Sequence, residues 1–461
     1  MFHNLLFDLV IVQDEAELDE LIDKARRSEH LFWDTETTGL RARYPGVVFP
    51  VGWTLAFDKE VDEAVYYIPQ GHLIEGEDAG NISDRLTKDF IVSRFPQKHH
   101  LFTNFDPTTY DDVPLYNMDS DVVINFINKL FALFYRKIKV AHNQSYDMHI
   151  LANETPIDVP LYYGNFMYDD TMVMQHTVDE EAELKLEKIV ENAFGFPKCD
   201  FKDVCNTITK EEKKVFGVTK IEDITFAMVT IAVGAMYSGE DVFFMRELYP
   251  ELLAWLERDG QYEYYREHRI PFLLTLWEME RRGLRFDVER AKVMAEKAQK
   301  VLDELTYKIF ELAGVEFNLN SNDQWNMLLY GHVKTTMDKE GNYKEGKVNE
   351  KILANSFNLP VVKWSKGGET KNKKLKNPST DDDARTKLLS MTFKKKEQIR
   401  GQKILKLYDR YKALSKLRNT YMIGGIDEVY PDGKIRPSFN QCGTVSHRIS
   451  CSNPKVNWGV A

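Results

Sequence analysis

The sequence predicts an α/β domain built on a mixed β-sheet, followed by a mainly helical region. Two observations support this fold class. Short apolar runs alternate with amphipathic segments over residues 7–152, and helical periodicity dominates from Glu267 onward. A chain of 461 residues, 43% of them hydrophobic, is long enough to divide into roughly two to four domains.

The first part of the chain alternates strands and helices in order. Apolar runs predict strands, and two of these segments have the alternating, aromatic character of antiparallel strands. The expected strands are 7–11, 30–33, 51–57, 64–69 and 138–141, and the expected helices are 14–25, 122–134 and 146–152. Strand 30–33 leads directly into the polar run DTETTG, which therefore lies at the end of a buried strand.

The rest of the chain is mainly helical. Residues 180–250 predict helices with a break near Gly195 and Pro197, the last helix covering about 226–248. A domain boundary is expected within 250–266. Gly283 closes the next helix, and Asp287 caps one that runs to about residue 313.

Beyond residue 313, composition changes along the chain. The stretch 331–378 is polar and rich in Gly, Asn and Lys, which predicts an extended or mobile loop. Helices resume over 381–422, and a strand is expected at 435–439 after the turn Pro431-Asp432-Gly433. The resulting division is 1–255, 256–425 and 426–461.

Composition excludes several classes of protein. No apolar run approaches the ~18 residues needed to span a bilayer, and the N-terminus lacks the pattern of a signal peptide, so a cytoplasmic protein without a membrane partner is expected. The four cysteines have neither zinc-clamp spacing nor the density of a disulfide framework. With 11 histidines and no helical His pair, oxygen ligands are expected for any catalytic metal.

Charge is divided unevenly along the chain. The net charge is −11, yet residues 361–420 hold 18 Lys and Arg against 6 Asp and Glu. Because phosphate contacts depend on a local basic surface, the overall charge argues neither for nor against a nucleic-acid partner. Lys371 to Lys376 fit a solvated loop as well as a phosphate contact.

Three separate segments place carboxylates where they can meet. Asp34 and Glu36, two residues apart at the end of an apolar strand, emerge at one sheet edge and suit a pair of metal ions. Asp147 follows a second strand, although a first-turn carboxylate there is also explained by the helix dipole. Tyr237 and Asp241 share a helix face, although in isolation this pair is more often a packed tyrosine and a solvated aspartate.

The order of the three segments resembles the DEDD exonuclease superfamily in its tyrosine-containing subclass. FWDTETTGL (32–40), NQSYD (143–147) and YSGED (237–241) look like its three motifs, with YIP (67–69), His72 and DTM (170–172) as supporting matches. The resemblance implies an RNase H-like fold and 3′–5′ exonuclease activity. It also implies a catalytic set made up of Asp34, Glu36, Asp147, Tyr237 and Asp241.

The same resemblance implies a role for each of these residues. Asp34, Glu36 and Asp241 would hold one Mg²⁺ or Mn²⁺, and Asp34 would share a second ion whose water shell Asp147 steadies. Tyr237 would orient the attacking water.

The resemblance also implies contacts with DNA around the site. Leu40 would wedge against the terminal base. Thr37 and Asn143 belong to the motifs that would contact the DNA strand.

The second half of the chain resembles family A DNA polymerases of the bacterial DNA polymerase I type. The matches are ME (279–280) with Gly283 and Asp287, GVEFNLNSNDQ (314–324), STD (379–381), KL (416–417) with TY (420–421), FNQ (439–441) and SHRIS (446–450). The earlier matches resemble the thumb and the last two resemble the start of the palm. They imply that the basic region 361–420 grips a primer-template duplex, and that Gln441 and Arg448 contact DNA at a primer end.

The chain departs from that family in several places. His447 stands where the family has glycine, residues 454–458 follow the family only loosely, and 333–357 is longer than the usual thumb tip. A palm carboxylate pair and fingers are not expected within these 461 residues, so the chain is expected to be inactive as a polymerase alone, with a second polypeptide or a truncated frame as explanations. The alternatives are an RNA 3′-end trimming exonuclease and a noncatalytic DNA-binding subunit.

Overall fold

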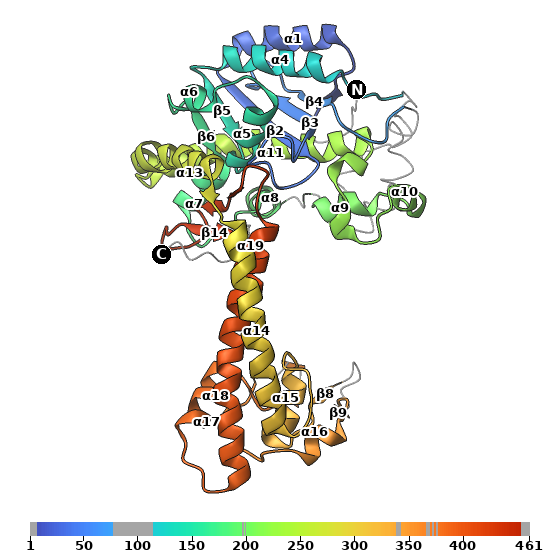
Figure 1. Cartoon of the computed structure of the whole chain (residues 1–461). Coiled ribbons are helices and arrows are strands. Elements are labelled where there is room, and N and C mark those ends of the chain that lie inside the picture. The colour runs from blue at the N-terminus through green and yellow to red at the C-terminus, as the bar shows by residue number, and fades with distance from the viewer. Residues whose placement is uncertain are drawn as a thin grey trace. The chain divides into compact units, whose positions relative to one another are not determined.

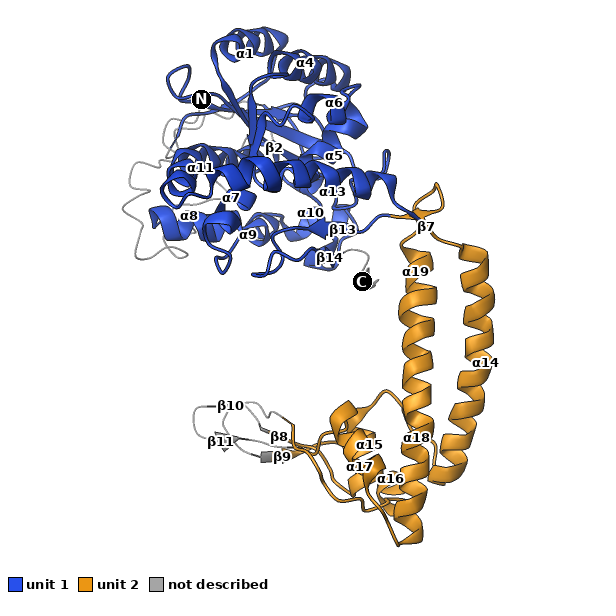
Figure 2. Cartoon of the chain, turned by 90° about the vertical axis from the view of Figure 1, so that its left-hand side faces the viewer, with its two compact units in different colours: residues 1–284, 436–453 blue, residues 285–435, 454–461 orange. Residues whose placement is uncertain are grey.

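In the computed structural model, the chain forms two compact units, each described here by itself (Figures 1 and 2). The structure describes residues 7–76, 114–195, 198, 200–337, 343–365, 369–370, 373–374 and 377–452. One unit comprises residues 1–284 with 436–453, and the other is formed by 285–435. The division expected from the sequence has its boundaries at residues 255 and 425 instead.

The first unit is built on a six-stranded mixed sheet with the strand order β1-β4-β3-β2-β5-β6. The strands are β1 (Leu9–Ile11), β2 (His30–Thr37), β3 (Pro50–Ala56), β4 (Val65–Pro69), β5 (Ile138–Ala141) and β6 (Tyr168–Asp170). β3 is antiparallel to β2 and β4, whereas β5 is parallel to β2 and β6. The α/β prediction is therefore confirmed. β6 is an additional edge strand that the sequence did not predict.

Helices cover both faces of this sheet. They are α1 (Glu15–Arg27), α4 (Ser120–Leu133), α5 (Ser145–Glu154), α6 (Val159–Tyr163), α7 (Thr171–Val178), α8 (Leu186–Phe194), α9 (Phe201–Asn206), α10 (Lys210–Val215), α11 (Ile231–Arg258), α12 (Tyr262–Tyr264) and α13 (Ile270–Arg282), with the short 3₁₀ turns η3 (Ile221–Asp223) and η4 (Phe226–Met228) and the π-helical turn η5 (Tyr265–Arg269). α1 and α4 lie side by side, and α11 packs along β1 to β4 (Figure 1).

The alternation of side chains along β2 sets the two faces. Trp33 is fully buried and its ring contacts Phe131 on α4 edge to face, with centroids 4.9 Å apart. The next residue, Asp34, faces α11, where Ser238 Oγ lies 3.4 Å from its Oδ2. One strand thus presents apolar residues to the α4 side and acidic residues to the α11 side.

A short hairpin from the far end of the chain belongs to the first unit. β13 (Ser438–Asn440) pairs antiparallel with β14 (Ser450–Ser452). The buried carboxylate of Glu280 on α13 accepts hydrogen bonds from the Phe439 backbone N–H at 2.6 Å, from Arg43 Nε at 2.9 Å and from His149 Nε2 at 2.7 Å. The strand predicted at 435–439 is in fact two short strands, β12 (Lys434–Ile435) and β13, which pair with different strands in separate sheets.

The second unit is helical and has its own apolar core. Its elements are α14 (Val288–Ala313), α15 (Asn322–Tyr330), α16 (Glu350–Ala354), α17 (Asp382–Ser390), α18 (Lys396–Lys416), the π-helical turn η6 (Leu417–Ile423) and α19 (Gly424–Asp427), with the short strands β8 (Thr335–Met337), β9 (Tyr343–Glu345), β10 (Glu369–Thr370) and β11 (Lys373–Lys374); β7 (Leu284–Arg285) lies at the unit boundary. The long helices α14 and α18 pack side by side (Figure 2). Trp325, Phe357 and Tyr408 belong to its core.

The predicted loop over 331–378 is wrong for the part of it that the structure describes. β8 and β9 form an antiparallel hairpin there, and α16 packs through Ile352, which is fully buried. The polar composition of this segment obscured the helix α16, in which Ile352 is the buried residue. One buried apolar side chain is enough to dock so short a helix. Most of the lysine-rich stretch from Lys371 to Lys376 lies outside the described residues, as do residues 454–458. No helix among the described residues is long and apolar enough to cross a membrane.

Candidate active site

The α11 side of β2 carries two carboxylates. Asp34 and Glu36 alternate with Trp33 and Thr35, so both project to the same face of the sheet. They stand opposite Thr54 and Gly52 on β3. A side chain at position 52 would collide with the Tyr67 ring, because its Cβ would lie 2.1 Å from the phenol oxygen. Glycine there lets Tyr67 close the floor of the site.

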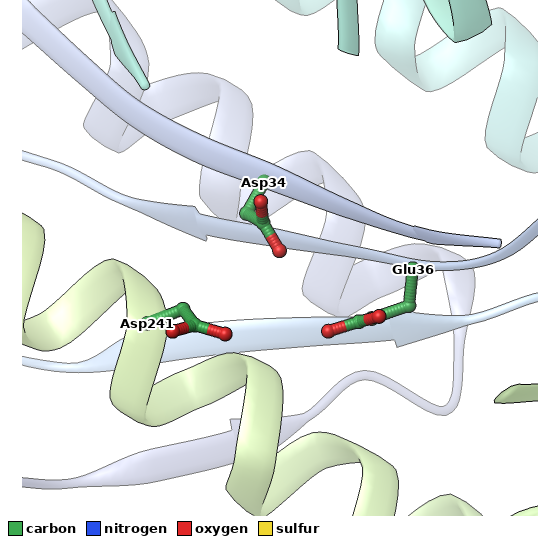
Figure 3. Close-up of side chains that lie close together, drawn as sticks. All are labelled: Asp34, Glu36 and Asp241. Carbon is green, nitrogen blue, oxygen red and sulfur yellow. The ribbon is translucent and has the colours of Figure 1, made fainter. Parts of the chain in front are cut away.

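Asp241 completes an acidic cluster from α11. Figure 3 shows the carboxyl groups of Asp34, Glu36 and Asp241 converging between the strand and the helix. One oxygen from each lies within 4.8 Å of the other two. The side chains are partly exposed, so an ion can reach them. Three oxygen ligands at this spacing match the preference of Mg²⁺ and Mn²⁺ for carboxylates.

Asp147 lies beside this cluster but is not a member of it. It stands in the first turn of α5 and is buried, and its Oδ1 accepts hydrogen bonds from the Thr35 backbone N–H at 3.1 Å and from Thr35 Oγ1 at 2.5 Å. These bonds fix the carboxylate to β2. Of the four acidic residues expected at the site, the structure thus brings three together and holds the fourth against the same strand.

Burial raises the pKa of each of the four carboxyl groups, and repulsion from neighbouring carboxylates raises it further. Burial raises the pKa of Asp34 to about 7, with repulsion from Asp241 as the next cause. Burial and the charges of Asp34 and Asp241 hold the pKa of Glu36 well above its usual range. Burial also raises the pKa of Asp147 and of Asp241. So many like charges held close together are typical of a site completed by a cation.

A lysine provides a positive charge inside the cluster. Lys198, between α8 and α9, forms an ion pair with Asp241 at 2.7 Å, and its side chain is fully buried. Burial alone would lower the pKa of Lys198, but the carboxylates of Asp241 and Glu240 raise it above the usual value. The ammonium lies 4.4 Å from the centre of the Tyr237 ring. This residue was not predicted from the sequence.

Tyr237 lies one helical turn before Asp241 and forms part of an aromatic wall. Its ring centroid is 5.9 Å from that of Phe226 and 6.4 Å from that of Phe201. Burial and the charge of Asp241 raise the pKa of the Tyr237 phenol, which therefore stays protonated and can donate a hydrogen bond.

A cleft of about 740 Å³ opens beside the cluster. Glu36, Tyr237 and Phe226 stand on one part of its wall, and the loop after β2 contributes Leu40, which is 75% exposed. Its lining is Thr35, Glu36, Thr37, Thr38, Gly39, Leu40, Tyr146, Phe201, Lys202, Cys205, Ile221, Glu222, Ile224, Thr225, Phe226 and Tyr237. Carboxylates at one end and aromatic rings along the wall suit a ligand that combines a charged group with a flat ring.

Of two further predicted residues, Thr37 lines this cleft and Asn143 does not. Thr37 Oγ1 donates to the Gly39 carbonyl at 2.9 Å and also contacts the Tyr146 hydroxyl, so it shapes the loop after β2. Asn143 has a left-handed backbone (φ 61°) that turns the chain from β5 into α5, and its N–H donates to Asp170 at 3.2 Å.

Gln441 and Arg448 lie on the β13–β14 hairpin rather than at the carboxylates. Gln441 is buried, and its Oε1 accepts a hydrogen bond from Arg269 Nε at 3.1 Å. Arg448 is exposed in the hairpin turn, where its carbonyl accepts from Thr444 Oγ1 at 2.9 Å. Neighbouring His447 has a left-handed backbone (φ 55°), which explains why glycine fits that position in the family the hairpin resembles.

Ser238, which was not predicted from the sequence as a site residue, supports Asp34. Ser238 Oγ lies 2.5 Å from Thr54 Oγ1 and 3.4 Å from Asp34 Oδ2, which links β3, α11 and β2 in a buried hydrogen-bonded chain. Ser238 sits inside the third motif, so its position could have suggested a role. Lys198 gave no comparable signal apart from being a lone lysine in an apolar run.

Comparison with known proteins relates the chain to DNA polymerase I. It is 23% identical over 452 residues to DNA polymerase I of Pseudomonas aeruginosa, covering 97% of this chain and 38% of that protein. Identity to DNA polymerase I of Borreliella burgdorferi is 24%, covering 96% of this chain and 37% of that protein. Over 219 residues, 47% of this chain, it is 30% identical to 20% of the Bacillus subtilis enzyme. No family model matches the sequence.

The fold is similar to that of a solved DNA polymerase. The structure titled as the POL domain of Pol1 from M. smegmatis, in complex with a DNA primer-template and dNTP, matches with a TM-score of 0.53 and 14% identity, covering 96% of this chain and 54% of that one. The resemblance to DNA polymerase I inferred from the motifs is thus confirmed over nearly the whole chain. The chain spans less than two fifths of the length of the first two relatives.

Proposed function

We propose that this chain is a metal-dependent 3′–5′ exonuclease that removes nucleotides from DNA ends as part of a DNA polymerase I-like replication protein. The observation that supports it most is the cluster of Asp34, Glu36 and Asp241, whose member Glu36 lines an aromatic-walled cleft. The cluster supplies the ligands for phosphodiester hydrolysis, and the cleft has room for a terminal nucleotide. The similarity to DNA polymerases supports DNA as the substrate.

The donor set fits two divalent ions. A site with only oxygen ligands and open space on the cleft side suits Mg²⁺ or Mn²⁺. A bound cation would stabilise the charged carboxylates and so lower their raised pKa values. Such ions lower the pKa of the attacking water and stabilise the leaving 3′ oxygen. Asp34, Glu36 and Asp241 would hold them, and Asp147, fixed by Thr35, would bind water at their edge.

The remaining residues position the substrate. The protonated Tyr237 phenol donates a hydrogen bond that orients the attacking water toward the phosphorus. Leu40 and the rings of Phe201 and Phe226 contact the terminal base and sugar. Stacking and apolar contact do not distinguish base edges, so little sequence preference is expected.

The test is digestion of labelled oligonucleotides by the purified chain. Wild type with Mg²⁺ is expected to shorten single-stranded DNA from its 3′ end, and Asp34→Ala is expected to retain less than about a tenth of that rate while still binding DNA. Asp19→Ala, an exposed acid on α1, is the matched control. Equal activity of Asp34→Ala and Asp19→Ala would refute the proposed site.

The same assay separates the two alternatives. An RNA of matched sequence that is degraded faster than the DNA would favour RNA 3′-end trimming. DNA binding without any metal-dependent degradation would favour a noncatalytic subunit. The intact carboxylate cluster argues against the second alternative.

A further inference from the structure

The Lys198 side chain lies where a cation would approach Asp241. Its Nζ is 2.7 Å from Asp241 Oδ1, and no part of the side chain is exposed. The ammonium also lies over the face of Tyr237, 4.4 Å from the ring centre. It therefore contacts the two residues of α11 assigned to the site.

A wholly buried ammonium is costly unless carboxylates surround it. Lys198 meets this condition because Asp241 pairs with it, and the charges of Glu240 and Glu187 also favour the protonated ammonium. Asp241 is at the same time one of the ligands expected for a divalent ion. An ammonium and a divalent ion on the same carboxylate repel each other, so each weakens the binding of the other to Asp241. The lysine and the metal therefore compete for one carboxylate.

Charge balance indicates where the ammonium goes when metal binds. Four carboxylates neutralise two divalent ions, which leaves the single negative charge of a bound phosphodiester without a counter-ion. The Lys198 ammonium, on a flexible stem at the edge of the cluster, is the cation available to meet it.

We infer that Lys198 is a further substrate-binding residue, whose ammonium pairs with Asp241 in the metal-free protein and moves to the phosphate of the 3′-terminal nucleotide when divalent ions bind. This inference rests on the proposed exonuclease function. The protein would then keep its acidic cluster folded without metal and reuse the same charge for substrate.

The first test measures metal binding without DNA. Lys198→Met keeps the apolar stem and removes the charge, so Mn²⁺ measured by calorimetry should bind at least about threefold more tightly than to wild type, and added Mn²⁺ should raise the melting temperature more. Lys210→Met, an exposed lysine on α10 outside the lining of the cleft, should leave both quantities unchanged. Unchanged or weaker Mn²⁺ binding by Lys198→Met would overturn the competition.

The second test measures turnover on single-stranded DNA at saturating Mg²⁺. Lys198→Met should lower kcat/KM at least about 30-fold, whereas Lys210→Met should stay within about twofold of wild type. Wild-type turnover by Lys198→Met would overturn the phosphate contact. Lys198→Gln, which keeps a polar end, serves in both tests if the melting curve shows that Lys198→Met is unfolded.

Failure of the inference and failure of the proposed function give different results. Wild type that binds Mn²⁺ but does not degrade DNA refutes the exonuclease, and with it the phosphate contact. Wild type that degrades DNA while both Lys198 variants behave like Lys210→Met refutes only the role of Lys198.

Discussion

Tyr237 is the residue whose role is most sharply testable by removing a single atom. Its ring is held by Phe201 and Phe226, so Tyr237→Phe should keep the fold while the water-orienting hydroxyl is lost. The rate of DNA degradation is expected to fall roughly 10- to 1000-fold with Mn²⁺ affinity unchanged. Single-turnover digestion and calorimetry measure the two quantities, with Tyr262→Phe on the surface as control. An unchanged rate would make Tyr237 a packing residue only.

His72 gives the first unit a predictable response to acid. Its Nδ1 lies 2.7 Å from the Val229 carbonyl and its Nε2 2.6 Å from the Tyr67 hydroxyl, which together satisfy the neutral ring. Burial lowers the pKa of His72 to about 4. Between pH ~6.5 and ~4 the unfolded chain therefore binds a proton that the folded chain does not, and the free energy of unfolding falls as pH falls.

Replacing His72 should make the unfolding free energy depend less steeply on pH in that window. His72→Gln should have a shallower loss of unfolding free energy between pH ~6.5 and ~4 than wild type, by up to about 3 kcal/mol over the window. Urea unfolding at a series of pH values measures this slope. His268→Gln, an exposed histidine, should keep the wild-type slope. Identical slopes for all three proteins would contradict the assignment.

Residue patterns predicted the acidic cluster but not its counter-ion. Asp34 and Glu36 lie at the end of a buried strand, and Tyr237 and Asp241 share a helix face. This local spacing was enough to predict that the carboxylates of Asp34, Glu36 and Asp241 lie close together. Lys198 comes from a connection between helices, where no periodicity fixes the direction of a side chain. Gln441, expected at DNA, is bonded to Arg269 instead of being exposed, a contact that depends on tertiary packing.

Element boundaries were predictable where a cap marks them. Asp287 caps α14 through the Arg290 N–H, and Gly314 ends the helix with a left-handed backbone, so the predicted range of 287–313 is confirmed. By contrast, α11 begins at Ile231 rather than 226, because residues 226–228 form a separate 3₁₀ turn. Composition alone could not predict the hairpin of β8 and β9, whose strands are only three residues long.

The exposed lysines at the start of helix α18 and just before it allow a test of DNA binding by the second unit. Ile404 and Leu405 face the core of the second unit, while Lys394, Lys395 and Lys396 are exposed. If these lysines contact phosphates, reversing all three to Glu should weaken binding to primer-template DNA and reduce the slope of log affinity against log salt by about 0.9 for each lost contact. Fluorescence anisotropy at several salt concentrations measures the slope.

The control for that experiment matches the change in net charge. Lys297, Lys300 and Lys308 are exposed lysines on α14, outside the basic region, and their reversal to Glu should leave the slope unchanged. Equal slopes for both triple variants and wild type would make the basic region a solvated surface. An equal reduction in both would show a response to net charge rather than to a particular helix.

Across the described residues, each of the two units has its own large apolar core. One contains Trp33, Trp53 and Phe131 under the mixed sheet, and the other contains Trp325 and Phe357 in the helical unit. Charge follows the same division, since the basic segment 361–420 lies in the second unit and the acidic cluster in the first. Separate cores predict separate unfolding transitions.

Metal binding should distinguish these two transitions. Asp34, Glu36 and Asp241 all belong to the first unit, and a ligand stabilises only the part of a protein whose folded state binds it. Saturating Mn²⁺ should therefore raise the melting temperature of one calorimetric transition by on the order of 5 °C and leave the other unchanged. Asp34→Asn should largely abolish the shift, since it removes a ligand and a repulsive charge together. Its metal-free transition should lie at or above that of wild type, because burial and Asp241 disfavour a charged Asp34 at neutral pH. A single transition would show that the two cores unfold as one. An equal shift of two transitions would show that metal binding stabilises both units, which contradicts the prediction.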